Sequence, residues 1–229
     1  MNVVLTDHLV CPRCGPPFGL VLLARDVRDR RVREGEFGCP NCRDRFPVGE
    51  GFADLRPPPR GPAPVEPEET DASAGEVESR ALRLAAALGV AEGPGLIVVP
   101  DAHRAEAGPL ARLVRGIEVV VVGWRGRAVA AKGVSAFVTG PKLPLRDGVV
   151  RGVVVAGAEG EGWWGESLRV LVPGGRVVIT GATPEAREWV GGAGLVTVLD
   201  EGGMVVAAVP APGTGPRPGR WVGTIGPPR

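Results

Sequence analysis

Four cysteines in two equal spacings constrain this chain more than any other feature. They form the motifs CPRC at residues 11–14 and CPNC at residues 39–42, and the 229-residue sequence has no other cysteine. Two residues between cysteines let both sulfur atoms converge on one ion, and four thiolates close a tetrahedral shell without an open position. The spacing therefore predicts a structural Zn²⁺ site with the ligands Cys11, Cys14, Cys39 and Cys42.

Two disulfide bonds, or a thioredoxin-like redox pair, are the rival explanations of these motifs. The first residues, MNVVL, lack the basic start and the long apolar stretch of a secretory signal. No apolar run approaches the roughly 20 residues that span a bilayer. We therefore expect a cytoplasmic location, reduced cysteines that hold zinc, and no membrane partner.

The composition divides the chain into four stretches. Residues 1–55 contain both cysteine motifs and are expected to form a zinc ribbon, while residues 56–75 are rich in proline and acidic residues and predict a linker. Residues 76–209 alternate valine-rich strands with helical patterns. Residues 210–229 are dominated by proline and glycine, and we expect a disordered tail there.

The longest stretch predicts an α/β fold. Apolar runs indicate buried strands at 96–99, 118–122, 136–138, 149–155 and 176–180, and a final pair of strands at 195–199 and 204–209. Helical patterns cover 76–88, 104–115 and 184–190, Gly108–Pro109 is expected to break or restart the second of these, and a further helix is expected to begin at Glu166. Strands that alternate with helices imply a mainly parallel, Rossmann-like sheet, with the final pair as an antiparallel edge.

The N-terminal stretch resembles the zinc-ribbon activator proteins that bind and stabilise methyltransferases. The resemblance covers residues 3–55 and rests on LVCPRC at 9–14, on the second cysteine motif, and on FPVGEGF at 46–52. Ala53 stands where that family usually has proline. The resemblance implies a module that covers apolar surface, either on the second domain of this chain or on a separate protein partner.

The second domain resembles the class I S-adenosylmethionine-dependent methyltransferases. The segment ESLRVLVPGGRVVI at 166–179 is similar to the family's helix–Pro-Gly-Gly–strand segment, and LPLRDGVVRGV at 143–153 to its Leu-Pro-Phe segment. The resemblance implies the family's fold for residues 76–209.

The same family holds its cofactor with groups that have no counterpart here. Its first strand ends in an acidic residue and a glycine-rich turn, whereas this chain reads Pro100–Asp101–Ala102–His103 and has no glycine until Gly108. Its second strand ends in an acidic residue that binds the ribose, whereas this chain has Gly123. Since each lost hydrogen bond to a carboxylate costs on the order of 1.5–3 kcal/mol, ordinary S-adenosylmethionine binding is not expected.

We therefore interpret the chain first as a zinc-binding pseudoenzyme, without catalytic residues, that acts as a scaffold or partner-binding protein. The alternative is a methyltransferase with an altered pocket around Asp101, Gly123 and Lys142, acting on RNA, protein or a small molecule; Asp101 and His103 could then form an acid/base pair. RNA recognition has weak support, because the net charge is +1 and aromatic residues make up 4% of the chain. The pair Trp163–Trp164 predicts either a partner-binding anchor or internal packing.

Overall fold

The computed structural model describes residues 1–62, 72–123 and 131–211. The predicted disordered tail lies, from residue 212 on, outside the described residues, as do residues 63–71 of the predicted linker. None of the helices in the described part of the chain has the length and apolarity that crossing a bilayer requires.

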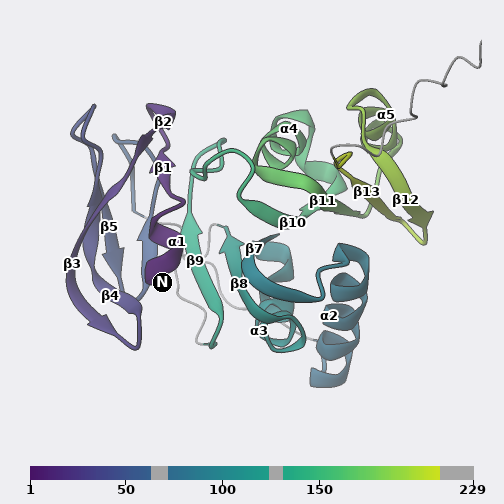
Figure 1. Ribbon diagram of the computed structural model, residues 1–229, viewed down its shortest axis with the longest axis horizontal. Coiled ribbons are helices and arrows are strands. Elements are labelled where there is room, and N and C mark those ends of the chain that lie inside the picture. The colour runs from purple at the N-terminus through teal and green to yellow at the C-terminus, as the bar shows by residue number, and fades with distance from the viewer. Residues whose placement is uncertain (63–71, 124–130, 212–229) are drawn as a thin grey trace, which may run out of the picture.

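One eleven-stranded sheet runs through the described part of the molecule (Figure 1). Strands from the N-terminal stretch form one end of this sheet and a hairpin forms the other. In spatial order the strands are β3 (Val21–Arg28), β4 (Arg31–Gly38), β5 (Arg45–Gly49), β6 (Phe52–Asp54), β9 (Val134–Val138), β8 (Arg115–Val122), β7 (Glu92–Pro100), β10 (Val150–Ala156), β11 (Leu171–Thr180), β13 (Met204–Ala208) and β12 (Val196–Glu201).

The middle of the sheet is parallel. Strands β9, β8, β7, β10 and β11 pair in parallel, and β13 is antiparallel to both of its neighbours, β11 and β12. The valine-rich strands are buried because helices cover both of their faces. The predicted Rossmann-like sheet with an antiparallel edge pair is thereby confirmed.

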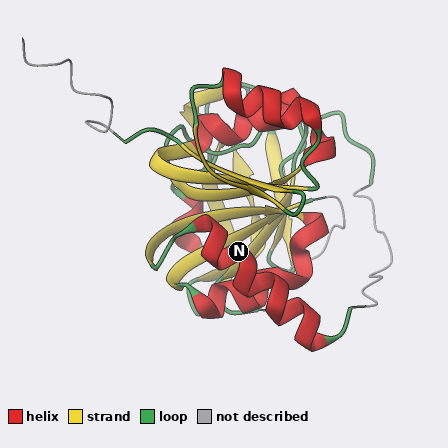
Figure 2. Ribbon diagram, turned by 90° about the vertical axis from the view of Figure 1, so that its right-hand side faces the viewer, coloured by secondary structure: helices red, strands yellow, loops and turns green. Residues whose placement is uncertain are grey.

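Helices form a layer on each face of the sheet (Figure 2). Helices α2 (Ala74–Leu88) and α3 (Arg104–Leu113) cover one face, and α4 (Glu161–Val170) and α5 (Pro184–Gly192) cover the other. Helix α2 begins at a capping box between Ser73 and Glu76, and it ends at Gly89, whose φ of +63° is left-handed. Two buried clusters result, one on each side of the sheet.

Two expectations about helices were wrong. Helix α3 continues through Pro109 to Leu113, because Ala107 and Leu110 are fully buried and this packing outweighs the hydrogen bond that proline removes. Helix α4 begins at Glu161, five residues before the expected start at Glu166, so that both tryptophans lie within it.

The four-cysteine module, our name for residues 1–55, contributes four strands to the common sheet. It also contains the short helix α1 (Val3–Thr6) and a small antiparallel pair, β1 (Val10–Cys11) and β2 (Gly15–Gly19). The charged residues 25–33 lie mostly in the β3–β4 hairpin, with its turn at Asp29–Arg30.

The module joins the parallel half of the sheet along a seam of backbone hydrogen bonds. Strand β6 pairs in parallel with β9, with Ala53 opposite Phe137. A second contact runs antiparallel at Leu9 and Leu145, where the Val10 amide donates to the Pro144 carbonyl at 3.0 Å. Strand pairing therefore continues from the module into the rest of the molecule without a gap.

A buried ion pair reinforces this seam. The Arg31 guanidinium on β4 donates to both carboxylate oxygens of Glu118 on β8, at 2.7 and 3.2 Å. The Ser135 hydroxyl donates to the same carboxylate at 2.6 Å, and the Asn2 amide donates to it at 2.9 Å. Glu118 is thus the common acceptor for side chains from both parts of the chain.

Candidate functional site

The structure brings the four cysteines together into one cluster. Their sulfur atoms all lie within 4.8 Å of one another, with 3.7 Å between Cys11 Sγ and Cys42 Sγ and 3.9 Å between Cys39 Sγ and Cys14 Sγ. All four are free thiols rather than disulfides. Since each motif contributes one buried and one half-buried sulfur, the cluster is close enough and closed enough to bind a metal ion.

Donors from the two motifs point at these sulfur atoms. The Cys14 amide lies 3.4 Å from Cys11 Sγ, and the Asn41 side-chain amide lies 3.3 Å from Cys14 Sγ. Burial opposes ionisation of Cys39, but hydrogen bonds from backbone amides and neighbouring thiols lower its pKa to about 7. Beside the cluster, Arg13 forms an ion pair with Asp44 at 2.9 Å, which links the first motif to the segment after the second.

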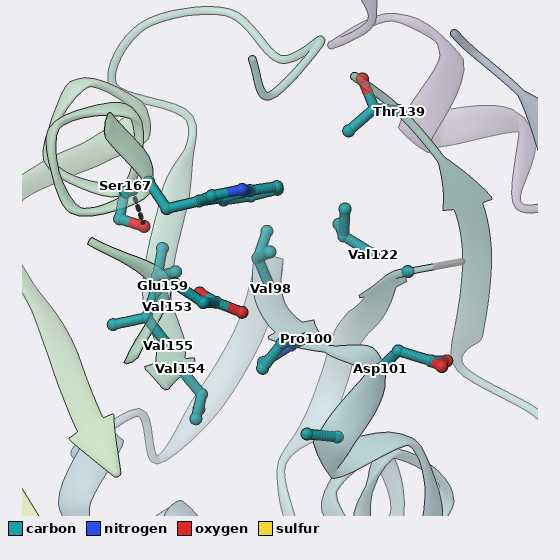
Figure 3. Close-up of a pocket in the computed structure, with 13 residues that line it drawn as sticks. Val98, Pro100, Asp101, Val122, Thr139, Val153, Val154, Val155, Glu159 and Ser167 are labelled. Carbon is teal, nitrogen blue, oxygen red and sulfur yellow. Dashed lines mark hydrogen bonds between the residues drawn. The ribbon is translucent and has the colours of Figure 1, made fainter. Parts of the chain in front are cut away.

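A cavity of about 360 Å³ opens at the carboxyl ends of the central strands (Figure 3). This edge is where open parallel sheets bind their ligands. The walls are mostly apolar, and the lining residues are Val98, Pro100, Asp101, Ala102, Val122, Gly123, Thr139, Val153, Val154, Val155, Glu159, Trp163 and Ser167.

Most polar groups of this cavity already have partners within the protein. The Ser167 hydroxyl donates to the Trp163 carbonyl at 2.8 Å, and the Thr139 hydroxyl donates to the Lys142 carbonyl at 2.9 Å. The Glu159 carboxylate points into the cavity (Figure 3), where desolvation raises its pKa against the opposing effect of a hydrogen bond with the Ala156 backbone. The cavity therefore offers a ligand chiefly apolar contact and one carboxyl group.

Asp101 occupies the space where the second central strand ends. A Cβ atom added at Gly123 would lie 2.2 Å from the Asp101 Cβ, so no side chain fits at position 123. The Asp101 carboxylate points away from Glu159 (Figure 3) and lies 3.3 Å from the Arg104 guanidinium. Packing by Asp101 thus gives a physical reason why this strand ends in glycine rather than in an acidic residue.

His103 belongs to a polar chain that links α2, α3 and β11. Its Nε2 atom lies 3.0 Å from the Thr180 hydroxyl, and its Nδ1 atom lies 3.7 Å from the Glu106 carboxylate, which also accepts from Arg80 at 2.5 Å. Glu106 is 2% exposed. Burial opposes its charge, but the nearby His103 ring and the hydrogen bonds from Arg80 and its own backbone amide outweigh burial and lower its pKa to about 2.

Sequence reasoning singled out His103 but missed its three partners. Glu106 had a detectable signal, because an acidic residue three positions after His103 lies in the first turn of the helix. Arg80 and Thr180 had none, since their proximity depends on how α2 and β11 pack around the same edge of the sheet.

The two segments that resemble methyltransferase motifs contact each other directly. Arg169 donates to the carbonyls of Leu143 and Leu145 and to the Asp147 carboxylate, and Glu166 accepts from the Leu143 amide at 2.9 Å. Helix α4 thereby holds the segment that leads into β10, which is an architectural role.

The remaining candidates from the sequence are Lys142 and the pair Trp163–Trp164. Lys142 is exposed and is not part of the cavity wall, so the structure does not bring it together with Asp101 and Gly123. Trp164 is buried and packs against Trp189, with 5.6 Å between the ring centroids, whereas Trp163 lines the cavity. Internal packing therefore accounts for Trp164.

No protein-family model and no curated protein matches this chain. Many solved structures are similar to part of it, and three of them illustrate the similarity. A candidate S-adenosyl-L-methionine-dependent methyltransferase from Methanococcus maripaludis has a TM-score of 0.41 at 13% identity and covers 59% of this chain and 85% of its own. A geranyl diphosphate methyltransferase in complex with SAM has 0.45 at 12%, over 61% and 92%. A Corynebacterium glutamicum protein has 0.43 at 13%, over 62% and 92%. At these identities and scores the similarity assigns no activity to the chain.

Proposed function

We propose that this chain is a zinc-stabilised, methyltransferase-like binding protein that does not catalyse methyl transfer. One observation carries the proposal, namely the Glu106 carboxylate at the start of α3. In open α/β sheets the helix that follows the first central strand offers its N-terminus to the anionic part of a ligand. In this chain Glu106 supplies that anion internally, and its charge is already matched by Arg80 and its own backbone amide.

Two further features at this edge support the proposal. Pro100 ends β7 and has no amide hydrogen with which to bind a cofactor carboxylate. Asp101 fills the space beside Gly123, so a ribose-binding acidic residue cannot stand there. The charged and hydroxyl-bearing parts of S-adenosylmethionine therefore lack the groups that usually hold them.

Zinc is the metal that best fits the four-cysteine cluster. Four sulfur atoms placed about 2.3 Å from a central Zn²⁺ lie about 3.8 Å apart in a tetrahedron. The measured 3.7 and 3.9 Å agree with this value, and sulfur atoms in a disulfide would be only about 2.0 Å apart. The ion would stabilise the fold, since no coordination position remains for a substrate.

Calorimetric titration of the zinc-loaded protein tests the main proposal. We expect no heat with S-adenosylmethionine or its demethylated product at millimolar concentration. Binding in the micromolar range would overturn the proposal and favour a methyltransferase with an altered pocket, with Glu159 as the polar group that the cavity offers.

Elemental analysis tests the metal separately, and we expect one zinc per chain. A protein mass lower by four hydrogens would indicate two disulfides instead.

The role that we propose for this chain, in place of catalysis, is that of a scaffold that binds a protein partner. Glu159→Gln removes the carboxyl group that points into the cavity and serves as a matched control. If this variant and the native protein capture the same partner, recognition lies outside the cavity, as the proposal requires.

A further inference from the structure

A second, larger cavity lies on the α2 side of the sheet and reaches His103 and Thr180 at the carboxyl edge. It is a groove of about 810 Å³ between helix α2 and the β12–β13 hairpin. Helix α5 packs on the opposite face of this hairpin, so the face toward α2 is left open (Figure 1). We call this cavity the hairpin groove.

Apolar residues make up much of the lining of the hairpin groove, beside the polar side chains of His103 and Thr180. Leu84 of α2 and Val206 of β13 are buried, at 2% and 1% exposed, and Ala87 and Met204 are partly buried. The hairpin edge adds Val198 and Leu199, which are 49% and 42% exposed. Such side chains leave apolar surface in contact with water unless a ligand covers it.

Positive charge surrounds this apolar surface. Arg80 and Arg83 project from α2, and Arg176 lies at the end of the groove near the α2 C-terminus, where it donates to the Ala87 carbonyl at 3.1 Å. The charge of Arg80 is matched by Glu106, but Arg83 is exposed and has no ion-pair or hydrogen-bond partner among the described residues. Glu201 on the hairpin is the acidic residue of the lining.

We propose that the hairpin groove binds a small amphiphile with an apolar chain and an anionic head, the head paired with Arg83. The volume lies within the range of small-molecule sites, about 300–1,000 Å³. The length of the groove also fits an alkyl chain. The part of β11 between Arg176 and Thr180, both of which line the groove, spans roughly 13 Å at about 3.3 Å per residue. The groove has no lining residue in common with the cavity beside Asp101, although it includes Arg80, His103 and Thr180 of the polar chain around Glu106.

Titration with dodecyl probes below their critical micelle concentrations tests this site. Dodecanoate and dodecyl phosphate carry anionic heads, and dodecyltrimethylammonium carries a cationic head on the same chain. We expect both anionic probes to bind, the tighter of them identifying the head group, and the cationic probe to bind at least about tenfold more weakly. Equal binding of all three, or no heat from any of them, would overturn the proposal.

Two matched pairs of variants locate the site. Arg83→Glu reverses the proposed head contact, and Arg25→Glu makes the same change on β3 at the other edge of the sheet. Val198→Asp places a charge in the apolar wall, and Val21→Asp does so at a similarly exposed site on β3. We expect Arg83→Glu and Val198→Asp each to weaken dodecanoate about tenfold, with circular dichroism unchanged; equal effects within either pair would contradict the assignment.

Discussion

Strands β4 and β8 have the same length, yet they are built in different ways. In β4, RVREGEFG, only Val32, Gly35 and Phe37 are buried, whereas in β8, RGIEVVVV, the last six residues are all buried. Strand β8 is covered on both faces and is stabilised by the apolar area that it removes from water. Strand β4 has one buried face, so the stability of the module around it depends more on interactions other than the burial of apolar area.

The comparison suggests that the two halves of the sheet respond to different perturbations. The parallel half has valine-rich clusters on both faces of the sheet, whereas the four-cysteine module adds its buried residues to the cluster on one face and holds the four thiols. Small domains of this kind commonly need a metal to fold. The predictions below separate the two sources of stability, beginning with the largest effect.

Removing one thiol should have the largest effect. Cys39→Ser leaves three thiolates, and structural zinc contributes roughly 10–16 kcal/mol of apparent binding free energy in small zinc modules. We expect loss of metal and of amide protection in β3, β4 and β5, with β7, β10 and β11 still protected in hydrogen exchange. Val27→Ser, an exposed change in the same module, should leave protection intact. Full protection of β3–β5 after zinc removal would show that the module is held by packing alone.

Breaking the ion pair between the halves should come next. Glu118→Ala leaves the partly buried Arg31 guanidinium without its carboxylate. Loss of one partner costs about 3–5 kcal/mol in a fully buried pair, and we expect a cost at the lower end of that range because the Arg31 side chain is 21% exposed. Glu36→Ala removes an exposed pair with Arg45 in the same module and should cost less than about 1 kcal/mol. Urea unfolding of both variants measures the difference, and similar costs would mean that Glu118 does not link the halves.

The smallest of the three effects is a pH dependence within the parallel half. The pKa of Glu106 is about 2 in the folded state, below its ordinary value near 4.5, so its contribution is fully present above pH 4.5 and is lost as the pH falls toward 2. Glu106→Gln should therefore cost roughly 3 kcal/mol at pH 7 and much less at pH 2.5. The readout is the difference between native and variant free energies of unfolding, because acid also protonates the cysteines in both proteins. A constant cost for Glu106→Gln across this pH range would exclude the charge as its cause.

Local patterns were sufficient to predict the parallel half of the sheet. Its strands are apolar runs such as 118–122, and its helices carry start and stop signals such as Ser73 and Gly89, so each element is specified by its own residues. Pro109 misled the prediction because burial of α3 depends on the sheet beneath it. The start of α4 was misplaced because Trp163 and Trp164 were read apart from the helix that contains them.

The polar edge of the sheet could be predicted only in part. The absence of a carboxylate at Gly123 was visible in the sequence, but its steric cause was not, because Asp101 reaches that point only through the fold. The same holds for the polar chain of Arg80, Glu106, His103 and Thr180, whose two ends are about 100 residues apart in the sequence. Spacing along the sequence identifies a cysteine cluster, but it does not identify groups that meet at a sheet edge.

The pairing of β6 with β9 has a consequence for the order of synthesis. Strand β6 leaves the ribosome about 80 residues before its partner, which at roughly 5–20 residues per second is a delay on the order of 4–16 s. During that interval the edge of β6 has no partner from this chain, and the N-terminal strands must hold their shape without the rest of the sheet. A metal ion bound early by Cys11, Cys14, Cys39 and Cys42 would keep the edge of β6 folded until β9 has been synthesised and can pair with it.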